Sequence, residues 1–218
     1  DALTANTTGN ESVAIGAYAL AANTTAGENT AVGYYTLGAN TTGTANVALG
    51  YRVLLANTTA SNNTGVGYQA LYTNTTGADL TAVGSGALTA NTGSNNTAVG
   101  RNALAANTTG TGNTGVGKDS LKANTTASNN TALGRTSLYQ NTTGDKNTGL
   151  GVNALYINTT GANCTAVGLS ALEQNNANNN TALGYQAALS NTTGANNIAI
   201  GYNSLYANTT GSENTAIG

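Results

Sequence analysis

The sequence predicts an all-β fold, a parallel β-solenoid of about thirteen coils with one coil per 17-residue repeat. Thr, Ala, Asn and Gly supply 142 of the 218 residues, and this composition disfavours helix. A 17-residue unit is also too short for a helical hairpin repeat. The repeat is marked by a glycine whose spacings are ten of 17 and two of 16 residues, at positions 16, 33, 50, 67, 84, 100, 117, 134, 151, 168, 184, 201 and 218.

With this glycine as repeat position 1, the unit is G-Y-x-A-L-x-x-N-T-T-G-x-x-N-T-A-V. The run N-T-A-V before each glycine favours a short strand, and N-T-T-G is a turn signal. Equivalent positions of successive coils then stack about 4.8 Å apart. The sequence therefore predicts columns of identical side chains along one repeat array spanning residues 1–218. Because the chain begins at Asp1, we expect it to be a segment of a longer protein.

Two repeat positions are almost always aliphatic. Position 5 is Leu in twelve of thirteen copies, and position 17 is always Val, Leu or Ile. We expect both positions to face the core. Position 16 is only Ala or Gly, which we interpret as close approach by a second surface. A laterally associated copy would supply that surface, and symmetry favours a closed ring of copies.

Charged residues occupy few repeat positions. All fourteen fall at positions 2, 3, 6, 12 and 13. Since unpaired charge avoids burial, these positions are predicted to face solvent. The net charge of −2 disfavours a nucleic-acid partner. No stretch approaches the roughly 20 apolar residues of a membrane span.

The residue types disfavour catalysis. The chain has no His and one Cys, so zinc sites and catalytic triads lack their usual residues. Its acids are dispersed with no evident pair beside a cleft. We expect no enzyme activity, no catalytic residue, no cofactor and no metal site. Cys164 is interpreted as a small apolar substitute in a partly buried column of Asn at position 14.

Asparagine at position 8 recurs in all thirteen copies, and two interpretations are open. Eleven copies open an N-T-T sequon, which favours N-glycosylation. Asn91 and Asn175 keep the Asn without the sequon, which favours a structural column of stacked Asn side chains. The same two repeats are 16 residues long, and a deletion in the turn just after this Asn aligns them. The sequon residues are Asn6, Asn23, Asn40, Asn57, Asn74, Asn107, Asn124, Asn141, Asn158, Asn191 and Asn208.

Position 2 is the most informative surface position. Tyr34, Tyr51 and Tyr68 occupy it in successive coils, and Arg101, Lys118 and Arg135 follow after Ser85. Aromatic faces suit sugars, and cations suit anionic groups. We therefore interpret these six residues as candidates for surface recognition, with acidic glycans as a partner. The alternative is a solvated corner of the coil without a ligand.

Two segments resemble known repeats. Glu11–Ala19, with the sequence E-S-V-A-I-G-A-Y-A, resembles the S-V-A-I-G-x-x-A repeat of YadA-type trimeric autotransporter adhesin heads. Asn63–Gly77 is similar to the N-T-A-V-G-Y-Q-A-L repeats of phage-type tail-fibre proteins. The resemblance implies a left-handed β-roll that forms a homotrimer outside the cell or on a virion. The unit of 17 residues is longer than the adhesin unit.

Together these observations predict a structural and adhesive extracellular fibre segment, located at a cell surface or virion tail. Its expected partners are further copies of itself and host-surface or acidic glycans. One alternative is a subunit of a polymeric filament or sheath, joined end to end. A second alternative is an ice-binding protein that uses the Thr rows at positions 9 and 10.

Overall fold

The computed structural model describes residues 1–218 and confirms the all-β solenoid. It contains thirteen strands of three residues and no helix. Each strand is the T-A-V run at repeat positions 15 to 17. The strands are β1 (Val13–Ile15), β2 (Thr30–Val32), β3 (Val47–Leu49), β4 (Thr64–Val66), β5 (Thr81–Val83), β6 (Thr97–Val99), β7 (Thr114–Val116), β8 (Thr131–Leu133), β9 (Thr148–Leu150), β10 (Thr165–Val167), β11 (Thr181–Leu183), β12 (Ile198–Ile200) and β13 (Thr215–Ile217).

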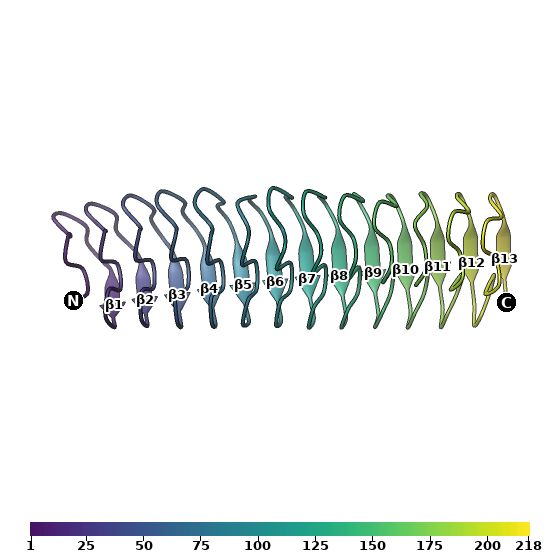
Figure 1. Ribbon diagram of the computed structural model, residues 1–218, viewed down its shortest axis with the longest axis horizontal. Helices are drawn as coiled ribbons and strands as arrows, with labels where there is room; N and C mark the ends of the chain where they lie inside the picture. The colour runs from purple at the N-terminus through teal and green to yellow at the C-terminus, as the bar shows by residue number, and fades with distance from the viewer. The chain divides into compact units, whose positions relative to one another are not determined.

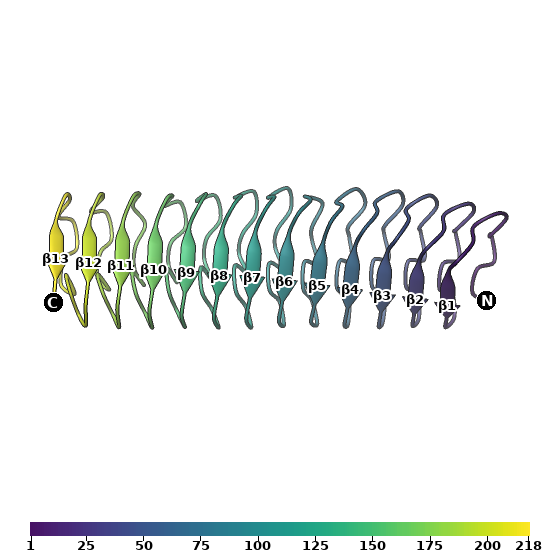
Figure 2. The same cartoon turned by 180° about the vertical axis from the view of Figure 1, so that it is seen from behind.

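The chain divides into two compact units, residues 1–109 with β1 to β6 and residues 110–218 with β7 to β13. Within each unit, successive strands pair in parallel with equivalent positions opposite each other, as in Ala14↔Ala31 and Ala182↔Ala199. Figure 1 shows these strands side by side within a unit, and Figure 2 shows the same coils from behind. One coil per repeat is therefore the structural unit, in agreement with the periodicity.

Hydrogen bonds between coils continue outside the strands. The Leu20 amide donates to the Thr36 carbonyl at 3.0 Å, and the Tyr35 amide donates to the Ala17 carbonyl at 3.0 Å. The backbone thus pairs with its neighbours around much of the coil, as buried peptide groups require. This pairing fixes each side-chain column in register.

The core prediction is correct for position 5 and wrong for position 17. Leucines at position 5, such as Leu71 and Leu121, are fully buried. In the strands it is position 16 that points inward, and Ala48 and Ala132 are fully buried there. Because side chains alternate along a strand, positions 15 and 17 both point outward. The Val, Leu and Ile residues of position 17 therefore lie on the surface.

The small residue at position 16 also has a different cause from the one we expected. It is packed by its own coil and not by a second surface. A Cβ at Gly65 would lie 2.5 Å from Cγ1 of Val53. Val53, at position 4 of the same coil, therefore occupies the volume that the Ala methyl group of position 16 fills in most other coils. In this coil the interior beside the strand is narrow enough that Val at position 4 goes with Gly at position 16.

Candidate functional surface

The outward residues of position 17 form an exposed aliphatic column. Leu49, Leu133 and Leu183 are 47%, 51% and 47% exposed. Position 15, on the same face, adds the exposed side chains of Val13 and Ile198. The aliphatic column comprises Ile15, Val32, Leu49, Val66, Val83 and Val99 in the first unit, and Val116, Leu133, Leu150, Val167, Leu183, Ile200 and Ile217 in the second. Extended exposed apolar patches mark interaction surfaces more often than ordinary solvent-facing surface.

Sequence reasoning missed this surface, although a signal for it was present. Thr usually fills position 15, and a period of two residues places positions 15 and 17 on one face. A Thr that faces solvent therefore implies an aliphatic side chain that also faces solvent. The invariably small position 16 between them then marks the inward side.

The position-8 asparagines form a buried side-chain ladder within each unit. Nδ2 of Asn40 donates to Oδ1 of Asn23 at 3.1 Å, and Nδ2 of Asn57 donates to Oδ1 of Asn40 at 2.9 Å. Nδ2 also donates to a turn carbonyl of its own coil, which is three residues ahead in the case of Asn40 and Gly43, at 2.9 Å, and two residues ahead in the 16-residue coils of Asn91 and Asn175. From Asn23 to Asn191 all these side chains are fully buried. They satisfy turn carbonyls that would otherwise be unpaired inside the coil.

The position-14 asparagines form a second buried ladder that links each coil to the next. The Asn63 amide donates to Oδ1 of Asn46, and Nδ2 of Asn63 donates to the Gly77 carbonyl in the following coil, both at 3.0 Å. Cys164 replaces Asn at this position and is fully buried, with its Sγ donating to the Ala177 carbonyl at 3.1 Å. Burial raises the pKa of the Cys164 thiol because desolvation penalises the thiolate.

The Thr rows at positions 9 and 10 have different environments. Position-9 hydroxyls donate to the carbonyl of the next coil, as in Thr7 to Thr24 at 2.9 Å and Thr41 to Thr58 at 3.0 Å. Position-10 residues such as Thr42 are exposed. The hydroxyl row of position 9 thus satisfies backbone groups. Because the position-9 hydroxyls already donate to the backbone, only the position-10 row remains for the ice-binding hypothesis.

The tyrosines of position 2 stack in the first unit. We call Tyr34, Tyr51 and Tyr68 the tyrosine column. Ring centroids of successive members lie 5.5 and 5.4 Å apart, with interplanar angles of 12° and 4°. Arg52, at the neighbouring position 3, lies with its guanidinium 5.2 Å from the Tyr51 ring centroid. The rings therefore cover one another's faces and present their edges to solvent.

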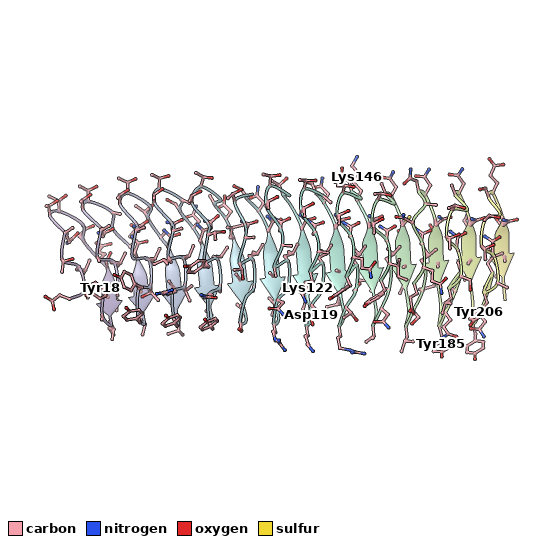
Figure 3. The ribbon with its side chains drawn as sticks, in the orientation of Figure 1. Tyr18, Asp119, Lys122, Lys146, Tyr185 and Tyr206 are labelled. Atoms are coloured by element: carbon pink, nitrogen blue, oxygen red, sulfur yellow. The ribbon has the colours of Figure 1, made fainter.

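The three cations of position 2 fall in different units. Arg101 lies in the first unit, and Lys118 and Arg135 lie in the second. Asp119 carboxylate oxygens lie 3.8 Å from Nζ of Lys118 and 3.7 Å from Nζ of Lys122. Figure 3 shows Asp119 and Lys122 together at one edge of the second unit, with Lys146 at the opposite edge. Asp119 therefore offsets part of the positive charge that the sequence places there.

The structure holds no pocket and no group of three His, Cys, Asp or Glu side chains arranged to bind a metal ion. It also holds no helix of the length and apolarity needed to cross a bilayer. The features available for recognition are the side-chain columns on the outer faces of the coils.

Comparisons with protein-family models, with curated proteins and with solved structures returned no match for this chain. The repeat and the pairing of the coils define the chain as a parallel β-solenoid repeat protein.

Proposed function

We propose that this chain is a non-catalytic structural and adhesive segment of an extracellular fibre, and that it associates laterally as a homotrimer. The observation that supports the proposal best is the aliphatic column. It places an aliphatic side chain on the outer face of every strand, and burying such surface stabilises by about 25 cal/mol per Å². A second copy is the proposed occupant because its own column is equally long, equally apolar and has the same spacing.

Closure of the assembly favours a ring of copies. Each unit of each copy carries part of the aliphatic column, on the same strand face as the position-15 side chains. A closed ring covers the column of every copy, whereas an open arrangement leaves one exposed at each end. The resemblance of the repeats to trimeric adhesin heads selects three copies. In such a trimer the exposed position-2 residues outside the interface remain free to contact other surfaces.

The oligomeric state tests the proposal. Light scattering coupled to size-exclusion chromatography should give three times the chain mass of 21.4 kDa. Replacing Leu133, Leu150 and Leu183 by Ser should reduce the mass toward that of one chain, because three side chains of one unit's column become polar. A chain that is monomeric at high micromolar concentration would contradict the proposal.

A matched control separates loss of the interface from loss of the fold. Thr131, Thr148 and Thr181 lie in the same three strands, point outward and already carry hydroxyls. Replacing them by Ser should leave the mass unchanged. Both triple variants should keep the β-type far-UV circular dichroism of the parent chain, since no inward residue is altered.

Electron microscopy tests the alternative of an end-to-end filament. Electron microscopy of the purified chain would show short particles for the homotrimer and continuous threads for a filament. Continuous threads that persist in the Leu133, Leu150 and Leu183 triple variant would favour the filament over the trimer.

A further inference from the structure

The tyrosine column ends abruptly inside the first unit. Tyr51 covers one face of the Tyr68 ring, and the next coil has only Ser85 and Gly86 at positions 2 and 3. Tyr68 is 54% exposed, against 38% for Tyr51, and no ring contacts its other face. Position 2 of the coil after that is Arg101. One coil thus interrupts the column between an aromatic ring and a cation.

Backbone hydrogen bonds hold these three coils in register. The Gly86 amide donates to the Tyr68 carbonyl at 2.9 Å, and the Asn102 amide donates to the Ser85 carbonyl at 2.9 Å. Strands β5 and β6 pair in the same register, with Val83 opposite Val99. Since each coil rises about 4.8 Å, the Cα atoms of Tyr68 and Arg101 are two steps, or about 10 Å, apart.

This gap has the dimensions of one ring. Tyr51 lies 5.4 Å from Tyr68, and a ring at the same distance on the other face would lie at the level of Ser85. Ser85 is exposed and leaves that level unfilled by any side chain larger than a hydroxymethyl group. An exposed aromatic face suits the C–H face of a sugar or another flat ring.

Arg101 defines the charge of the ligand. It is exposed, and neither of the two ion pairs in the structure involves it. A guanidinium binds a carboxylate through two parallel hydrogen bonds. Lys118 and Lys122, by contrast, already share Asp119. Arg101 is therefore a cation without an acidic partner, beside an open aromatic face.

We propose that Tyr68, Ser85 and Arg101 form a binding site for a uronic acid residue of an acidic polysaccharide. The sugar ring stacks on the open face of Tyr68 at the level of Ser85. Its carboxylate accepts hydrogen bonds from Arg101, and its hydroxyls exchange hydrogen bonds with Oγ of Ser85. The proposal rests on the adhesive function above and assigns its ligand class to position 2 of three successive coils, at residues of the first unit.

Ser85→Tyr is the most discriminating variant. The added ring would extend the tyrosine column, stack on Tyr68 and fill the gap, so the fold should be at least as stable as before. Calorimetric titration with tetragalacturonate should then show at least a tenfold loss of affinity. Arg101→Ser should cause a similar loss, and Arg135→Ser, which removes an equal charge in the second unit, should change the affinity less than twofold.

Two ligand controls complete the experiment. The methyl ester of tetragalacturonate keeps the rings and removes the charge, and it should bind at least tenfold more weakly. Inorganic sulfate supplies charge without a ring and should not compete. Undiminished binding by Ser85→Tyr, or an equal loss in Arg135→Ser and Arg101→Ser, would overturn the site. Light scattering on the same variants reports separately on the trimer, so failure of one proposal is distinguishable from failure of the other.

Discussion

At the scale of single residues, the coil has positive φ at four repeat positions. Glycine always supplies it at position 1, as in Gly50 with φ of 133°, and rarely at the other three. Positions 3, 5 and 13 have positive φ, as in Tyr35 at 54°, Leu71 at 55° and Glu28 at 62°. This conformation costs roughly 1–2 kcal/mol for an ordinary L-residue. At position 5 the burial of Leu offsets that cost. At the solvent-facing position 13, Asn is the commonest residue, because it tolerates left-handed backbone best after Gly.

Ala45 is an exception at position 13, with φ of 55° and no side-chain group to favour it. Ala45→Asn should stabilise the chain by about 0.5–1 kcal/mol, since Asn adopts this conformation more readily. Thermal unfolding should show a melting temperature about 1–4 °C higher. Ala105→Asn is the control, because Ala105 has negative φ and should gain nothing. Equal shifts in the two variants would mean that left-handed backbone is not the cause.

The buried Asn ladder leads to a prediction about glycosylation. Nδ2 of a position-8 Asn makes two hydrogen bonds inside the coil, so an attached glycan would remove a donor and would not fit. An oligosaccharyltransferase should therefore modify the unfolded chain at many sequons and the folded chain only at Asn6, whose side chain is exposed in the first coil. Mass spectrometry of glycopeptides distinguishes the two patterns. Modification of Asn57 or Asn141 in the folded chain would contradict the ladder.

At the scale of the structural element, the sequence predicts the coil better than it predicts which side of the strand faces inward. Periodicity locates every strand, because each ends at the recurring glycine. The prediction of the inward-facing strand position is wrong because hydrophobicity favours Leu133 over Ala132 as the core residue. At the strand the interior accommodates only the Ala or Gly of position 16, and the recurring large inward side chain of the coil is Leu of position 5. Which strand position faces inward is therefore set by the volume available inside the coil, and the sequence of a single repeat does not show that volume.

Two leucines in the second unit test this assignment. Leu121 is fully buried, and Leu121→Ala should destabilise the chain by about 2–5 kcal/mol because it leaves a cavity. Leu133 is 51% exposed, and Leu133→Ala should cost less than about 1 kcal/mol in chemical denaturation of the dilute, monomeric chain. Similar losses in the two variants would return position 17 to the core.

The candidate surfaces were predictable only in part. The sequence identifies Tyr34, Tyr51 and Tyr68 as neighbours because they share one repeat position, and equivalent positions of successive coils stack on one another. It does not show that Asp119 lies between two lysines, since positions 2, 3 and 6 are brought together only by the turn of the coil. The sequence also does not single out Ser85, because its proposed role depends on the absence of a ring at that level of the tyrosine column.

At the scale of the whole molecule, stability is the sum of similar coils and the interfaces between neighbours. Within each unit a strand contacts only the strand before it and the strand after it. Repeat proteins of this kind tolerate changes in coil number more readily than changes in coil length. The 16-residue coils show where length can vary. Asn91 still donates to the Gly93 carbonyl and accepts from Asn107, each at 2.6 Å, although one turn residue is missing.

Removal of one complete coil tests this additivity. Deletion of residues 50–66 joins Leu49 to Gly67 and keeps every later residue at its own repeat position. We expect the β-type circular dichroism per residue to be unchanged and the melting temperature to fall only slightly, because one interface is lost and its neighbours re-form the same pairing. Deletion of residues 50–57 removes fewer residues but shifts the register, so that Leu and Asn no longer stack on their equivalents. That shorter deletion should unfold the surrounding coils and lower the melting temperature far more. If the two deletions were equally harmful, stability would depend on the particular residues removed and not on the register of the columns.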